Sequence, residues 1–146
     1  MAGRTTAHPV DVLLVEDDAG DALMITEALR QCKAPCRLHR VADGDAALEF
    51  LRRGAGFAQA PRPALILLDL NLPRRGGLEI LAMVKADETL RPIPVIVLSS
   101  SRSPDDVQRS YELHASAYIV KPADYDGMAD VIRQIDAFIG IIQLPR

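Results

Sequence analysis

The most constraining feature of the sequence is a set of short, nearly continuous apolar runs that recur along the chain. Three of them, VDVLLV at 10–15, ALILLDL at 64–70 and IPVIVLSS at 93–100, carry apolar side chains at successive positions rather than at every second one. Strands of this kind are buried on both faces, which is typical of a parallel sheet that is covered by helices. The runs therefore predict a parallel sheet at the centre of the molecule.

Segments with a helical period separate these runs. We predict helices over 20–32, 43–53, 77–86, from 103 onward and over 124–143, and two further strands over 36–41 and 116–122. The second-last helix has a clear start, because Ser103 suits an N-cap and Pro104 suits the first helical position. Five strands that alternate with five helices predict an α/β fold, with right-handed crossovers and an open, doubly wound parallel sheet.

Length and composition narrow the classes of protein that fit. The 146 residues are most simply one domain, 1–146, with a core at about 9–140 and a C-terminal tail at 141–146. The net charge of −3 lacks the excess of Lys and Arg that a nucleic-acid-binding surface needs. No apolar run is long enough for a membrane span, and the N-terminal segment lacks the apolar region of a signal peptide. Cys32 and Cys36 have no Cys or His partner at zinc spacing, so we expect free thiols and a cytoplasmic protein.

Polar residues follow the predicted strands at the edge where such folds bind ligands, beyond the carboxyl ends of the strands. Glu16 and Asp17 follow the first strand, Asp69 the third, Ser99 the fourth and Lys121 the fifth. Crowded carboxylates repel one another, and a hard divalent cation such as Mg²⁺ relieves this by taking oxygen ligands and keeping some waters. We expect Asp17 and Asp69 as direct ligands and Glu16 as a ligand through water.

The same set of groups suits phosphoryl chemistry. A metal-bound Asp69 beside Lys121 is a reasonable nucleophile that would form an aspartyl phosphate. The cation and Lys121 would share the charge of the phosphoryl oxygens, and the hydroxyl of Ser99 would donate to one of them. Any one of these residues alone is more simply a cap or a surface charge. It is their combination at one edge that indicates a site.

Taken together, these residues resemble the response-regulator receiver domain of two-component signalling over about residues 9–140. The resemblance rests on the acidic pair Glu16-Asp17, on LLDLNLPRRGGLEIL around Asp69, on Ser99, on Tyr118 in the fifth strand and on the Lys121-Pro122 pair. It implies a flavodoxin-like, five-stranded sheet in the order 2-1-3-4-5 with five helices. It also implies a protein that is not an enzyme, that needs Mg²⁺, and that accepts a phosphoryl group on Asp69 from a histidine of a sensor kinase.

The resemblance also assigns roles to individual residues. Asn71 would offer its main-chain carbonyl to the metal, Gly77 is the family's glycine just beyond the loop, and the Lys121–Pro122 peptide bond would be cis. The phosphoryl-binding and switch residues would be Ser99, Ser100, Lys121 and Tyr118. Ser100 and Ser101 depart from the family, since many receivers carry a small apolar residue and a charged one there, which leaves the phosphoryl lifetime open.

More narrowly, the sequence is similar to the short response regulators that partner bacterial phytochromes. This implies a receiver that acts alone through protein contacts, with a phytochrome-type kinase as its phosphoryl donor and a homodimer as its assembly. The alternative is a phosphorelay intermediate that passes the phosphoryl group to a second histidine protein. The last helix supports a dimer, because its apolar positions are broader than one face, with Phe138, Ile139 and Ile142 as candidates. A well-packed terminal helix would explain the same positions.

Three other interpretations fit less well. A phosphatase of the haloacid-dehalogenase type wants a second acid two residues after the nucleophile, where this chain has Asn71. A flavodoxin-like binding module wants a phosphate loop after the first strand, where EDDAGD would repel a phosphate. A receiver that is never phosphorylated is disfavoured because the expected pocket has all of its groups.

Overall fold

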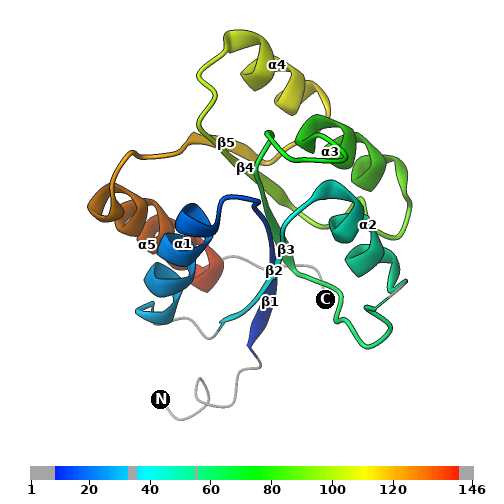
Figure 1. The fold of residues 1–146 in the computed structure, drawn as a ribbon, viewed down its shortest axis with the longest axis horizontal. Coiled ribbons are helices and arrows are strands. Elements are labelled where there is room, and N and C mark those ends of the chain that lie inside the picture. The colour runs from blue at the N-terminus through cyan, green and yellow to red at the C-terminus, as the bar shows by residue number, and fades with distance from the viewer. Residues whose placement is uncertain (1–8, 33–35, 55, 142–146) are drawn as a thin grey trace.

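The computed structural model describes residues 9–32, 36–54 and 56–141, and within them five strands alternate with five helices (Figure 1). The elements are β1 (Val10–Val15), α1 (Ala19–Arg30), β2 (Cys36–Val41), α2 (Gly44–Arg52), β3 (Leu65–Leu68), α3 (Gly77–Ala86), β4 (Val95–Ser99), α4 (Pro104–Glu112), β5 (Ala117–Val120) and α5 (Tyr125–Ile141). No helix in this part of the chain is long and apolar enough to cross a membrane.

All the strands are parallel, and their order is β2-β1-β3-β4-β5. Helices α1 and α5 cover one face of the sheet, and α2, α3 and α4 lie on the other (Figure 1). The doubly wound, flavodoxin-like fold is therefore confirmed. The chain reverses its direction of winding between β1 and β3, and ligands of such sheets bind at this switch point.

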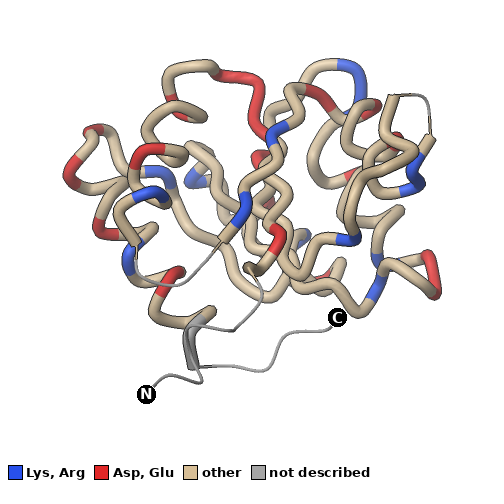
Figure 2. Tube along the Cα trace, turned by 90° about the horizontal axis from the view of Figure 1, so that it is seen from below, with Lys and Arg blue, Asp and Glu red and all other residues tan. Residues whose placement is uncertain are grey.

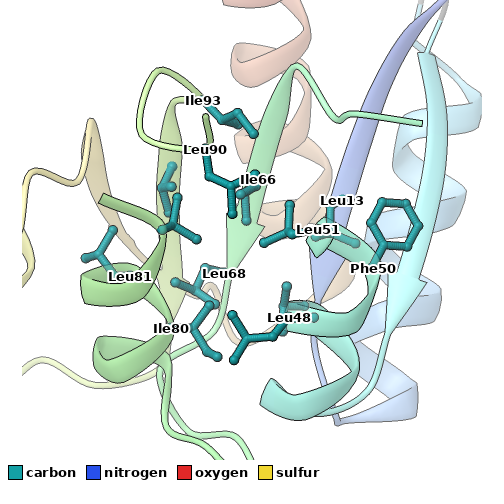
Figure 3. Close-up of a cluster of buried hydrophobic side chains, with 14 of the residues drawn as sticks. Leu13, Leu48, Phe50, Leu51, Ile66, Leu68, Ile80, Leu81, Leu90 and Ile93 are labelled. Carbon is teal, nitrogen blue, oxygen red and sulfur yellow. The ribbon is translucent and has the colours of Figure 1, made fainter. Parts of the chain in front are cut away.

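The two-sided burial of the strands explains the continuous apolar runs. Successive side chains of a strand point to opposite faces. Ile66 and Leu68 of β3 thus join the cluster under α2 and α3 (Figure 3), whereas Leu65 and Leu67 join the cluster under α1 and α5. Each fully buried Leu or Ile contributes about 1.5–3 kcal/mol relative to an exposed side chain. A rigid sheet results, and it fixes the positions of the residues at its carboxyl edge.

Helix α4 begins as the sequence predicts. Ser103 has extended backbone angles, and its side-chain oxygen accepts a hydrogen bond from the Asp106 N–H at 3.3 Å. Pro104 occupies the first helical position, where a missing N–H costs nothing.

The structure corrects the predicted place of one residue, Ile139, in the dimer surface. Ile139 is only 7% exposed and packs in the cluster under α1 and α5, because it lies on the face of α5 that meets the sheet. Its expected place at a surface is wrong. Phe138, one residue earlier and therefore on another face, is 45% exposed. Ile142 lies outside the described residues.

Candidate functional site

The acidic residues meet at the carboxyl edge because of the register between β1 and β3. Val15 pairs with Leu68. The residues that follow them, Glu16 and Asp69, therefore lie side by side. Both are nearly covered, with 1% and 5% of their surface exposed, whereas Asp17 is exposed. Carboxylate oxygens of Glu16, Asp17 and Asp69 lie within 4.8 Å of one another. The expected acidic cluster is present.

Lys121, just after β5, points its ammonium group into this cluster. Its Nζ lies 2.7 Å from Glu16 Oε1 and 3.1 Å from Asp69 Oδ2, and its side chain is 7% exposed. The Lys121 N–H donates to the carbonyl of Ser99 at 2.8 Å, which holds the ends of β5 and β4 together. Lys121 therefore connects three parts of the sheet: its main chain is bonded to the end of β4, and its ammonium group contacts the residues that follow β1 and β3.

Asp21 is a member of the site that sequence analysis missed. Its Oδ2 accepts from Lys121 Nζ at 2.9 Å, so three carboxylates surround one ammonium group. Asp18 caps α1 by accepting from the Gly20 and Asp21 N–H groups, which fixes the first turn of the helix. Asp21 lies within α1 and not at the end of a strand, so the pattern of polar residues at strand ends did not include it. The signal was the fourth acid of EDDAGD, one helical turn after Asp17.

Burial and charge shift the pKa values of Glu16 and Lys121. Burial raises the pKa of the Glu16 carboxyl to about 7, the nearby charge of Asp69 acts in the same direction, and the hydrogen bond from Lys121 opposes both. Burial disfavours the charged form of Lys121, but its contacts with Glu16, Asp21 and Asp69 outweigh this and raise its pKa. The ammonium group thus stays protonated, while the carboxylates around it still repel one another.

The donor set fits a hard divalent cation. The three grouped side chains offer only carboxylate oxygens, and the exposed Asp17 lies at the open side of the cluster. Mg²⁺ and Mn²⁺ prefer such ligands over nitrogen or sulfur. Figure 2 shows acidic and basic positions interspersed along the described part of the trace.

Two glycines hold the loop between β3 and α3 close to Asp69. A Cβ on Gly77 would lie 2.3 Å from the Asp69 carbonyl oxygen, and a Cβ on Gly44 would lie 2.4 Å from the carbonyl oxygen of Arg75. Only glycine allows this approach. Within the loop, the Asn71 N–H donates to Asp69 Oδ1 at 3.3 Å, and the Asn71 side chain is exposed. Metal binding by its carbonyl stays a prediction.

The expected switch residues are distributed around the end of β4. Ser99 is fully buried, and Ser100 is exposed. The Tyr118 hydroxyl donates to the carbonyl of Ser101 at 2.8 Å, and the Tyr118 N–H donates to the hydroxyl of Tyr111 at 3.0 Å. Tyr118 therefore links β5 both to the loop after Ser99 and to α4. The switch roles of these residues stay predictions.

The peptide bond before Pro122 corrects a second expectation. Within the described part of the chain no peptide bond is cis, so the Lys121–Pro122 bond is trans. The trans form of an X–Pro bond is the more stable one by about 0.5–1 kcal/mol, and cis requires contacts that select it. The Lys121 ammonium reaches the carboxylates without such a turn.

Comparison with known sequences identifies one family. The profile of the response regulator receiver domain matches residues 12–133. Response regulator Rcp1 of Synechocystis sp. is 40% identical over 130 residues, which are 89% of this chain and 88% of that protein. Sporulation initiation phosphotransferase F of Bacillus subtilis is 31% identical over 124 residues, which are 84% and 90% of the two chains.

Solved structures agree with the sequences. The Mn²⁺-bound form of Rcp1 superposes with a TM-score of 0.90 at 39% identity, covering 94% of this chain and 100% of that one. The phosphorylated cyanobacterial phytochrome response regulator RcpA gives 0.91 at 41% identity, covering 95% and 100%.

The raised pKa of Glu16 predicts a pH dependence of stability in the absence of metal. Its pKa rises from 4.5 to about 7 on folding, so the folded protein holds this proton more tightly and loses stability as the pH rises from about 4.5 through 7. We expect Glu16→Gln, which does not titrate, to lose less stability than wild type over this interval. Urea unfolding in EDTA at pH 5 and pH 7.5 measures both. Equal losses in the two proteins would contradict the assignment.

Proposed function

We infer, because the chain belongs to the response regulator receiver domain family, that it accepts a phosphoryl group on Asp69 from a histidine of a sensor kinase. One observation supports this above all. The Asp69 carboxylate lies at the mouth of the central strand, 3.1 Å from the Lys121 ammonium and within the acidic cluster that suits a divalent cation. Its role is then signalling, without catalytic turnover of its own.

The transfer uses Asp69, Lys121 and Ser99 of this chain together with the phosphohistidine of the kinase and a divalent cation. A carboxylate oxygen of Asp69 forms a bond to phosphorus, the N–P bond of the phosphohistidine breaks, and the imidazole keeps the electron pair and takes up a proton. Lys121 is already within hydrogen-bond distance of Asp69 Oδ2, so its charge offsets that of the phosphoryl oxygens. Ser99, at the end of the neighbouring strand, would donate its hydroxyl to one of them.

Asp17, Asp69 and the carbonyl of Asn71 would hold Mg²⁺ directly, with Glu16 as a ligand through water. When bound, the cation supplies positive charge to the phosphoryl oxygens and relieves the repulsion among the carboxylates. The oxygen-only cluster of Glu16, Asp17 and Asp69 supports this, and so does the Mn²⁺-bound form of the relative Rcp1.

The donor in our proposal is a phytochrome-type kinase, and residues 1–146 act in the cytoplasm as one domain through protein contacts. The likeness to RcpA, a cyanobacterial phytochrome response regulator, supports this pairing. The likeness to sporulation initiation phosphotransferase F supports the alternative, a phosphorelay intermediate that hands the phosphoryl group to a second histidine protein. Transfer from the labelled protein to a purified histidine phosphotransfer protein separates the two roles.

Asp69 should be the sole acceptor. With Mg²⁺ and phosphoramidate, a small-molecule donor, wild-type protein should gain the mass of one phosphoryl group. Asp69→Asn should gain none, because its amide is not a nucleophile. Asp130→Asn, which changes an exposed carboxylate on α5, is the matched control and should behave as wild type. A phosphorylated Asp69→Asn protein would overturn the site.

Removal of Mg²⁺ should lower stability through Asp17. A ligand that binds only the folded state raises the melting temperature, so wild type should melt higher with Mg²⁺ than with EDTA. Asp17→Ala should lose this increment, and its metal-free form should be at least as stable as wild type because one repelling charge is gone. Differential scanning calorimetry measures both. An unchanged increment in Asp17→Ala would remove it from the ligand set.

We also propose that the protein forms a homodimer through the outer side of α5. Phe138 is exposed there and lines an apolar groove of about 410 Å³ beside β5. The other apolar side chains of the groove are Ile96, Ala117, Ile119, Val131 and Ile135. Burial of the exposed Phe138 ring between two chains would contribute about 1.5–3 kcal/mol before association costs are subtracted.

Phe138→Asp should therefore weaken the dimer at least about tenfold, which corresponds to about 1.4 kcal/mol. Ala137→Asp adds the same charge one residue earlier, outside the groove, and is the matched control. Light scattering over a range of micromolar concentrations measures the association. A wild-type protein that is monomeric throughout, or a Phe138→Asp protein that is folded and as dimeric as the control, would exclude this surface.

A further inference from the structure

Arg40 of β2 contacts the acidic pair from the neighbouring strand. Its Nε donates to the main-chain carbonyl of Glu16 at 3.0 Å, and its Nη2 donates to that of Asp17 at 3.2 Å. Strand β2 lies next to β1 in the sheet (Figure 1), and Arg40 pairs with Leu14, two residues before Glu16. One guanidinium group thus holds two consecutive peptide carbonyls at the start of the loop between β1 and α1.

The loop is attached to β2 at a third point as well. The Glu16 N–H donates to the carbonyl of Val41 at 3.1 Å. Both main-chain polar groups of Glu16 are therefore bound to the end of β2. Because these bonds use the peptide groups, the direction in which the Glu16 and Asp17 side chains leave the main chain is fixed.

Arg40 leaves the carboxylates themselves available. Among the described residues no ion pair joins its guanidinium to the side chain of Glu16 or Asp17, and its two hydrogen bonds to this loop are to main-chain carbonyl oxygens. The carboxylate oxygens of the two acids instead approach Asp69 to within 4.8 Å. An arginine that neutralised the acids would compete with a cation, whereas Arg40 contacts their main-chain carbonyls.

We propose that Arg40 is a positioning residue for the divalent cation, which holds the main chain of Glu16 and Asp17 in the conformation that directs their carboxylates toward Asp69. This rests on the proposed function, in which the cation binds there. Groups that orient metal ligands from behind commonly change metal affinity by about 10–100-fold when they are mutated.

Two effects of Arg40 on cation affinity have opposite signs, which makes the proposal testable. Its positive charge repels a cation, so a purely electrostatic role predicts tighter binding when the charge is removed. Its planar pair of N–H donors orients the ligands, so a positioning role predicts weaker binding when that geometry is lost. Arg40→Lys keeps the charge and loses the planar pair of donors. Arg40→Ala loses both.

The measurement is Mg²⁺ affinity of the purified protein by isothermal titration calorimetry. We expect the Kd of Arg40→Lys and of Arg40→Ala to rise on the order of tenfold. Arg37→Lys is the matched control, because Arg37 lies on the same strand, binds the Asp11 carboxylate and does not contact the loop. Its Kd should equal that of wild type.

Each outcome bears on a separate statement. An unchanged Kd in Arg40→Lys, or a lower Kd in Arg40→Ala, would overturn the positioning role while leaving the site intact. If the Asp17→Ala variant still binds Mg²⁺ with the wild-type Kd, the proposed metal site itself is contradicted. Urea unfolding in EDTA measures the free energy of unfolding of the metal-free variants. If Arg40 only positions the metal ligands, Arg40→Lys and Arg37→Lys should have similar values.

Discussion

The contact between one ammonium group and three carboxylates is the interaction on which the site depends. Lys121 belongs to the segment after β5, Glu16 and Asp69 follow β1 and β3, and Asp21 lies on α1. The parallel sheet, in the order β2-β1-β3-β4-β5, brings these segments together at its carboxyl edge. The charges do not balance, since three acids share one base, and burial raises the pKa of the Glu16 carboxyl. The fold thus maintains a local excess of negative charge, which fits a divalent cation and would favour its binding.

The buried sheet supports this unfavourable cluster. Strands that are apolar on both faces are rigid, and the carboxylates attached to their ends have little freedom to move apart. The loops complete the restraint through close contacts, namely Gly77 against the Asp69 carbonyl, Gly44 against Arg75 and the guanidinium of Arg40 under the acidic pair. The apolar core and the polar site are therefore parts of one arrangement rather than separate features.

The sequence predicted the features that depend on periodicity and on strand ends. The continuous runs predicted a parallel sheet, and the residues after the runs included Glu16, Asp17, Asp69 and Lys121, which the structure brings together. Asp21 and Arg40 were missed because their roles come from tertiary contacts, one from a helix turn and one from a neighbouring strand. Ile139 was assigned to a surface because apolar positions alone do not show which face of α5 meets the sheet. The trans Lys121–Pro122 bond depends on local packing that a short motif does not encode.

The hydroxyl of Tyr111 has a consequence for the solubility of the molecule. Strand β5 lies at the end of the sheet, and the edge of such a strand offers unpaired N–H groups to which a strand of another chain can add. The Tyr118 N–H points away from β4 and is occupied by the Tyr111 hydroxyl from α4. The strand is only four residues long, so one occupied amide removes much of the available pairing edge. A side chain on a helix thus protects this edge against strand addition, and self-association along it must use side chains rather than an extended sheet.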